Sequence, residues 1–176
     1  MLEEVKQIKV KRSEFATFLN TTPSASSPTW SRFGKGVTSQ SVAYNPTVNS
    51  EQYIDEDNAT SSVDAYAPTI NTPQTAYHGN PVFVYVDGLR RKRAIGDDAL
   101  TEVLLVYIYD KNSDGSYPAE KQPASISITD FGGDAGNPLN ITYDIGFVGD
   151  PVKGTVSISN GVVVFKSEAD TPQEEE

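Results

Sequence analysis

The sequence predicts a mainly β protein, a two-sheet β-sandwich with one α-helix packed against its side. Short apolar or alternating runs recur along the chain and are densest in its C-terminal half. An Asn-Gly dipeptide separates two of them, which is a strong hairpin signal. A single segment near the middle has apolar residues at helical spacing. The 176 residues fit one domain, expected over residues 13–167, with a long loop and flexible termini.

The N-terminal half has few regular signals. Residues 1–12 mix acidic and basic side chains, so we expect a flexible arm that orders only against a partner. Strand-like runs follow at Glu14–Leu19, Thr29–Phe33 and Ser39–Ile54. Residues 55–80 hold few large aliphatic side chains, two prolines and a glycine, which predicts a long loop without a regular element. Loops of that length are usually functional or disordered, and this one suits folding against a neighbouring molecule.

The segment from Asn80 to Gly96 is predicted to contain the helix. Asn80 suits an N-cap and Pro81 suits the first helical position. Apolar residues then recur at helical spacing as far as Leu89, followed by four basic residues and the glycine, as at many helix C-termini. Alternating valines leave a strand as the alternative. We expect the helix.

The C-terminal half is predicted to be β throughout. Glu102–Asp110 is densely apolar, as is typical of a strand buried on both faces. Ser125–Phe131 and Ile141–Phe147 alternate between apolar and polar residues, which predicts one buried and one wetter face.

A tight hairpin is predicted at the C-terminal end of the domain. Val156–Ser159 and Val162–Phe165 flank Asn160-Gly161, and both of those residues tolerate the positive φ of a type I′ turn. The resulting register places two apolar pairs on one face as a core hairpin, namely Val156 with Phe165 and Ile158 with Val163.

The composition argues against most catalytic sites. The chain has no cysteine and one histidine, His78, so thiol chemistry and sites with two imidazoles are excluded. No nucleophile lies in a strained elbow such as GxSxG. We therefore expect no enzyme, no catalytic residue and no cofactor. The chain has no apolar run long enough for a membrane span and does not begin like a signal peptide.

Charge is unevenly distributed along the chain. The net charge is -10, and residues 168–176 carry five acids and no base, which predicts a disordered acidic tail. The rest of the chain is also acidic, which argues against ordinary nucleic-acid binding. Asp55–Asp57 is expected at an interface or facing a lumen. The basic run Arg90–Arg93 is expected to be a solvated helix end or a surface for an acidic neighbour.

Asp110–Gly115 matches the first half of an EF-hand calcium loop. The twelfth position should be a bidentate glutamate and is Lys121 instead, and a predicted strand rather than a helix precedes the loop. A polar turn between strands explains the same residues. No metal site is therefore predicted.

Four long stretches resemble the major tail proteins, or tail-tube proteins, of long-tailed (siphovirus-like) bacteriophages of Gram-positive hosts. They are Glu14–Pro23, Trp30–Val37, Tyr53–Thr60 and Val86–Asp97. The likeness extends over residues 13–165.

The resemblance implies a tail-tube fold and a structural role in the virion tail, with assembly in the host cytoplasm. In that family six subunits close into a ring, and rings stack into a tube around the tape-measure protein. The tube ends at tail terminator and distal tail proteins, conducts DNA without binding it specifically and contacts no membrane. We expect the subunit or ring interface to include these residues: Asp55, Glu56, Asp57, Tyr66, Tyr77, Arg90, Arg91 and Arg93.

Two other hypotheses remain open from the sequence. A non-enzymatic β-sandwich that binds carbohydrate or acts in adhesion would use exposed aromatic side chains, and the nine tyrosines allow it. Such a module could hold calcium at Asp110–Gly115. The third hypothesis is an enzyme that uses His78 or the acidic residues 55–57.

Overall fold

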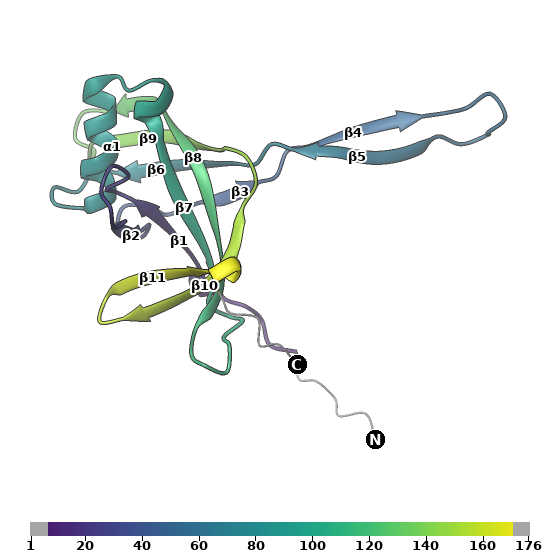
Figure 1. Ribbon diagram of the computed structural model, residues 1–176. Coiled ribbons are helices and arrows are strands. Elements are labelled where there is room, and N and C mark those ends of the chain that lie inside the picture. Colours follow the sequence, from purple (N-terminus) through teal and green to yellow (C-terminus); the bar gives the residue numbers. More distant parts are fainter. Residues whose placement is uncertain (1–6, 171–176) are drawn as a thin grey trace. The chain divides into compact units, whose positions relative to one another are not determined.

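The computed structural model describes residues 7–170 (Figure 1). The outer parts of the predicted arm, residues 1–6, and of the predicted acidic tail, residues 171–176, lie outside the described residues. The strands form one large antiparallel sheet and one two-stranded sheet, and the described residues contain one α-helix. The predicted fold class, a mainly β sandwich with one helix, is confirmed.

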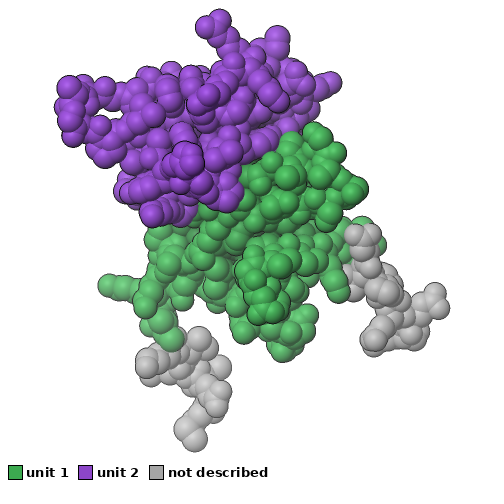
Figure 2. Space-filling model, turned by 90° about the vertical axis from the view of Figure 1, so that its left-hand side faces the viewer, with its two compact units in different colours: residues 1–33, 102–122, 150–176 green, residues 34–101, 123–149 purple. Residues whose placement is uncertain are grey.

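The chain divides into two compact units, coloured separately in Figure 2. Unit 1 holds residues 1–33, 102–122 and 150–176, and unit 2 holds residues 34–101 and 123–149. Two long strands, β7 (Leu100–Tyr107) and β8 (Tyr117–Gly132), contribute to both. The single domain expected over residues 13–167 stays a prediction.

Unit 1 is built from antiparallel strands. Strand β1 pairs with β2 and β7, the first part of β8 pairs with β10, and β10 pairs with β11. The remaining bounds are β1 (Phe15–Asn20), β2 (Trp30–Arg32), β10 (Val152–Ser159) and β11 (Val162–Ser167). Short 3₁₀ helices lie at Arg12–Glu14 and Glu168–Asp170, so the predicted acidic tail begins with an ordered turn.

The β10–β11 hairpin has the predicted turn and register. Asn160 and Gly161 have φ values of 49° and 79°, as a type I′ turn requires. Both predicted pairs, Val156 with Phe165 and Ile158 with Val163, are present.

Only part of this hairpin belongs to the core of unit 1. Val156 is fully buried, and Val163 and Phe165 pack against the cluster that it joins. Ile158 is 40% exposed, which corrects its prediction as a core residue. The pairing of β10 with β8 ends at Val156, so the strand beyond that point is no longer covered. Gly154 is needed here because a Cβ would meet the Lys166 carbonyl oxygen and the Phe165 ring.

Unit 2 combines part of the large sheet with the helix and a projecting hairpin. The second part of β8 pairs with β9, β9 pairs with β6, and β6 pairs with β3, while β4 and β5 pair with each other. The bounds are β3 (Ser41–Ala43), β4 (Pro46–Glu51), β5 (Thr60–Tyr66), β6 (Thr69–Thr75), α1 (Pro81–Lys92) and β9 (Asn140–Phe147). A 3₁₀ helix follows α1 at Gly96–Ala99.

The helix α1 begins as the sequence predicts. The Asn80 side chain accepts a hydrogen bond from the Phe83 backbone N–H at 3.0 Å, and Pro81 occupies the first turn. The C-cap at its end is Arg93, which has the left-handed conformation with a φ of 51°, and Gly96 three residues further on also has a positive φ, of 57°. Across residues 7–170, no helix has both the length and the apolar character needed to span a membrane.

The prediction of residues 55–80 as a loop without a regular element is wrong. Strands β5 and β6 both lie within it. In β6 the inward-facing residues are Ile70, Thr72 and Gln74, so the buried face is mostly polar and gives no apolar alternation. Those polar groups are satisfied: the Gln40 side chain donates to Thr72 Oγ1 at 3.0 Å, and the Tyr143 hydroxyl donates to Gln74 Oε1 at 2.9 Å.

Candidate self-assembly surfaces

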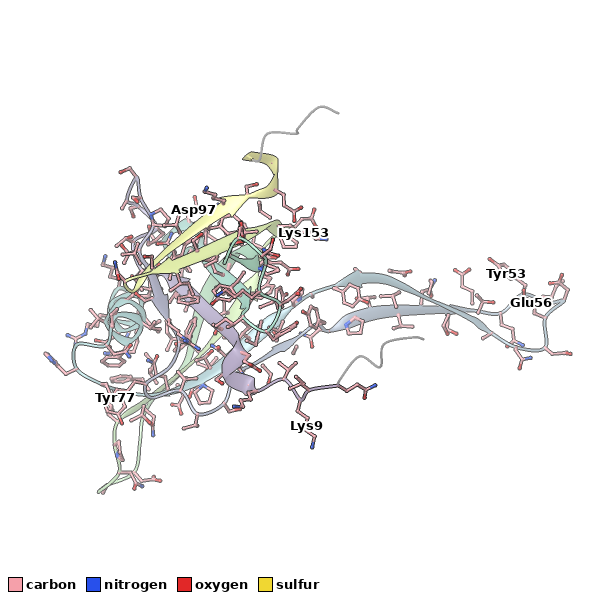
Figure 3. The ribbon with its side chains drawn as sticks, turned by 90° about the horizontal axis from the view of Figure 1, so that it is seen from below. Lys9, Tyr53, Glu56, Tyr77, Asp97 and Lys153 are labelled. Carbon is pink, nitrogen blue, oxygen red and sulfur yellow. The ribbon has the colours of Figure 1, made fainter. Side chains whose placement is uncertain are left out.

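The β4–β5 hairpin, residues 46–66, projects from the rest of unit 2 (Figures 1 and 3). In the described part of the chain its two strands pair only with each other, and every residue from 46 to 66 is exposed. A lone two-stranded ribbon is at best marginally stable in water. The hairpin therefore lacks the packing that normally keeps such a ribbon ordered.

Apolar side chains lie uncovered along this hairpin. Val48 and Val63 face each other across the two strands and are 58% and 53% exposed. Near the tip, Tyr53 is 60% exposed and Ile54 is completely exposed. Scattered exposed apolar residues are normal, but a projecting element that has no buried face at all is typical of an interaction surface.

All the charged side chains of the hairpin are acidic. Residues 46–66 contain no lysine or arginine and these five acids: Glu51, Asp55, Glu56, Asp57 and Asp64. Figure 3 shows Tyr53 and Glu56 at the far end of the hairpin. The turn is held by a hydrogen bond from the Glu56 N–H to the Tyr53 carbonyl at 3.1 Å. The predicted acidic residues 55–57 thus lie together at the tip of a projecting element.

The two predicted interface tyrosines lie apart from that tip. Tyr66 is at the base of the hairpin, where its ring contacts Tyr44 edge to face with centroids 6.3 Å apart. Tyr77 lies in the segment before α1, and the Lys35 ammonium is 4.6 Å from its ring centroid. The structure does not bring Tyr66, Tyr77 and the acidic tip into one cluster within a single chain.

The predicted arginines at the end of α1 divide into two groups. Arg90 and Arg91 both bind the buried Asp87, at 2.8 Å and 2.7 Å, and the Arg90 guanidinium also stacks on the Phe131 ring at 3.7 Å. Arg93 is exposed at the helix C-cap, and no described residue forms an ion pair with it. The first two arginines therefore stabilise unit 2, while the third is available for contacts outside the chain.

The Asp87 carboxylate should make folding sensitive to acid. Burial raises its pKa, but hydrogen bonds and positive charge from Arg91 and Arg90 lower it by more, so its pKa lies below the usual 3.8. Because the pKa of Asp87 is lower in the folded state than in the unfolded state, the stabilisation is full above the unfolded-state pKa of 3.8. It is lost as the pH falls through the folded-state pKa.

We expect Asp87→Asn to lower the free energy of unfolding at neutral pH by about 0.5–1 kcal/mol, because the ion pairs are partly exposed. The difference between variant and wild type should shrink below about pH 4. Urea unfolding at neutral and acid pH measures both quantities. A difference that stays constant down to acid pH would contradict the role given to this carboxylate.

A shallow groove lies beside the C-terminal end of α1. Its volume is about 1020 Å³, and it is lined by the last turn of α1, residues 93–97 and 99–100, the β8 segment 125–131 and Val148. Its lining includes no tyrosine, tryptophan or histidine. Its one aromatic lining residue is Phe131, whose ring is stacked against the Arg90 guanidinium, and the exposed His78 is not part of the groove.

Asp110–Gly115 forms a polar turn. The Asp114 carboxylate accepts hydrogen bonds from the Ser116 hydroxyl at 2.6 Å and from its N–H at 2.9 Å. These bonds lower the pKa of Asp114. Asn112 binds Ser116 as well, with its side-chain amide donating to the hydroxyl at 3.0 Å. The polar side chains thus close the turn on itself, as turn residues commonly do.

Comparison with known proteins finds similarity in structure but not in sequence. No protein family model matches the chain, and no curated protein matches it. Among solved structures, a chain from the tail of an empty GTA particle, refined with C6 symmetry, has a TM-score of 0.58 at 10% identity. The match covers 81% of this chain and 97% of that one.

Two further structures are more distantly similar. A chain of the anti-feeding prophage (AFP) baseplate has a TM-score of 0.47 at 9% identity, over 85% of this chain and 97% of that one. A chain of the sheath-tube complex of an extracellular contractile injection system, PVC, has a TM-score of 0.44 at 9% identity, over 90% and 92%. Of the three likenesses, the first is high enough to show a shared fold.

Proposed function

We propose that this chain is a structural subunit of a phage tail tube. The observation that carries the proposal is the fold, which is shared over 81% of the chain with a protein from the tail of a particle with C6 symmetry. The resemblance of residues 13–165 to major tail proteins of siphovirus-like phages of Gram-positive hosts points to the same role. The chain acts as a building block of the virion tail, assembled in the host cytoplasm, and not as an enzyme.

Six copies form a ring and rings stack into a hollow tube. Unpaired edges support this arrangement, because within residues 7–170 β2 pairs only with β1, β11 only with β10, and β3 only with β6. Exposed edge strands invite uncontrolled pairing unless they are covered, and a closed ring covers them with neighbouring copies. The uncovered β4–β5 hairpin gains its missing packing from another copy.

The tube encloses the tape-measure protein, meets tail terminator and distal tail proteins at its ends, and then conducts DNA. The acidic composition supports the last step. With a net charge of -10 per chain, a ring repels the phosphate backbone and does not hold the DNA that passes through it.

Light scattering coupled to size exclusion, followed by negative-stain microscopy of the concentrated protein, tests the proposal. The expected result is sixfold rings or hollow tubes whose proportion rises with protein concentration. A chain that remains strictly monomeric at high concentration would show that it is not a tube subunit.

A further inference from the structure

We propose that the tip of the β4–β5 hairpin of one copy docks into the groove beside α1 of a second copy. Ile54 enters the groove, and the acidic residues beside it face Arg93 at the rim. This inference rests on the proposed function, because it names the acceptor surface through which copies join.

The tip presents an exposed apolar side chain next to carboxylates. Ile54 is completely exposed, and it lies between Tyr53 and Asp55. The Tyr53 hydroxyl donates to Glu51 at 3.0 Å, and the Gln52 side chain donates to the Glu56 carbonyl at 3.0 Å. These contacts fix the turn while leaving Ile54 with nothing to pack against.

The groove offers the complementary chemistry. The β8 segment 125–131 contributes isoleucines and a phenylalanine to its lining, and the exposed Ile95, at 81%, stands at its edge. Arg93 supplies positive charge at the helix end, where Arg90 and Arg91 are already held by Asp87. Asp97 and Asp130 also line the groove, so the cationic contact is confined to the rim formed by the helix end.

The occupant must come from another molecule. The hairpin and the groove both belong to unit 2, and the hairpin points away from α1 in Figure 1. A net acidic segment suits a cationic rim, and the hairpin is the described segment that joins acids to a fully exposed aliphatic side chain. Opposite charges across an interface fix its register and favour the correct partner.

Site-specific crosslinking tests the contact, because the chain has no cysteine. An Ile54→Cys protein is mixed with an Ile95→Cys protein and treated with a short bismaleimide. The expected product is a crosslinked dimer in the mixture and not in either protein alone. Val162→Cys, which replaces another exposed apolar residue at 62% exposure, is the matched acceptor and should give no such dimer with Ile54→Cys.

Charge exchange provides a second readout. We expect Arg93→Glu or Asp55→Lys alone to raise the protein concentration needed for assembly by about tenfold, and the two together to recover most of that loss. Lys111→Glu, the same charge change in an exposed turn, should leave assembly unchanged. Melting temperatures confirm that each variant still folds.

The outcomes separate this inference from the proposed function. Tubes that form without a crosslink between positions 54 and 95, or in which the hairpin crosslinks to position 162, overturn the acceptor groove and leave the tube intact. A crosslink between Ile54→Cys and Ile95→Cys proteins, together with wild-type protein that forms only dimers, supports the groove and overturns the tube.

Discussion

Replacing residues 48–64 by an Asn-Gly turn is expected to abolish the formation of tubes while leaving the chain folded. The residues removed are all exposed and contribute nothing to the core of unit 2. Thr47 and Ala65 are already paired across the strands, so a two-residue type I′ turn can join them without moving β3 or β6. The Tyr44–Tyr66 contact at the base is kept.

The same variant should have nearly normal stability. Because only surface residues are lost, we expect the free energy of unfolding of the monomer to change by about 0.5 kcal/mol or less. Negative-stain microscopy reports assembly, and urea unfolding reports folding. Ser61→Ala removes only a long hydrogen bond to Ser50, at 3.4 Å within the hairpin, and should assemble as the wild type does. Tubes formed by the shortened variant would show that the hairpin is dispensable.

The elements that the sequence predicts well are those with local signals. Asn160-Gly161 sets both the turn and the register of β10–β11 through its own backbone preferences. Asn80 and Pro81 fix the start of α1 in the same way, through a side-chain cap and a pre-set φ. Local chemistry of this kind needs no knowledge of the surrounding fold.

The missed strands depend on partners that are distant in sequence. In β6, Thr72 and Gln74 can be buried because Gln40 and Tyr143 provide hydrogen-bond partners. The sequence of β6 therefore lacks the apolar alternation that would predict a strand. In β8, Pro118 and Pro123 obscured the first part of the strand, since proline normally argues against a strand interior. Only the segment from Ser125 onward has the usual alternation.

The candidate surfaces were only partly predictable for the same reason. The acidic run at residues 55–57 is visible in the sequence, but its place at the tip of a hairpin is not. The basic run looks uniform in the sequence. In the structure, Asp87 on the preceding turn of α1 forms ion pairs with Arg90 and Arg91 but not with Arg93. An acid three or four residues before an arginine is a signal that could have separated them. Ile95 carries no local signal for its exposure.

Leu104→Ala and Leu105→Ala should each lower the free energy of unfolding by about 2–5 kcal/mol. These neighbours point to opposite faces of β7, and their side chains are 0% and 2% exposed. Leu104 belongs to the cluster that the β10–β11 hairpin covers. Similar losses in the free energy of unfolding at both positions are expected only of a strand that is buried on both faces, as the apolar run 102–110 predicts.

The measurement is best made in the variant with the shortened hairpin, because assembly would otherwise add to the apparent stability. Leu139→Ala, in the loop before β9, is the matched control: Leu139 is 45% exposed, and its truncation should cost about 0.5 kcal/mol or less. If Leu104→Ala lowers the free energy of unfolding and Leu105→Ala leaves it nearly unchanged, one face of β7 is open to solvent in the monomer. That face would then itself be a surface that assembly must cover, so this pair of substitutions tests whether the isolated subunit is already a complete sandwich.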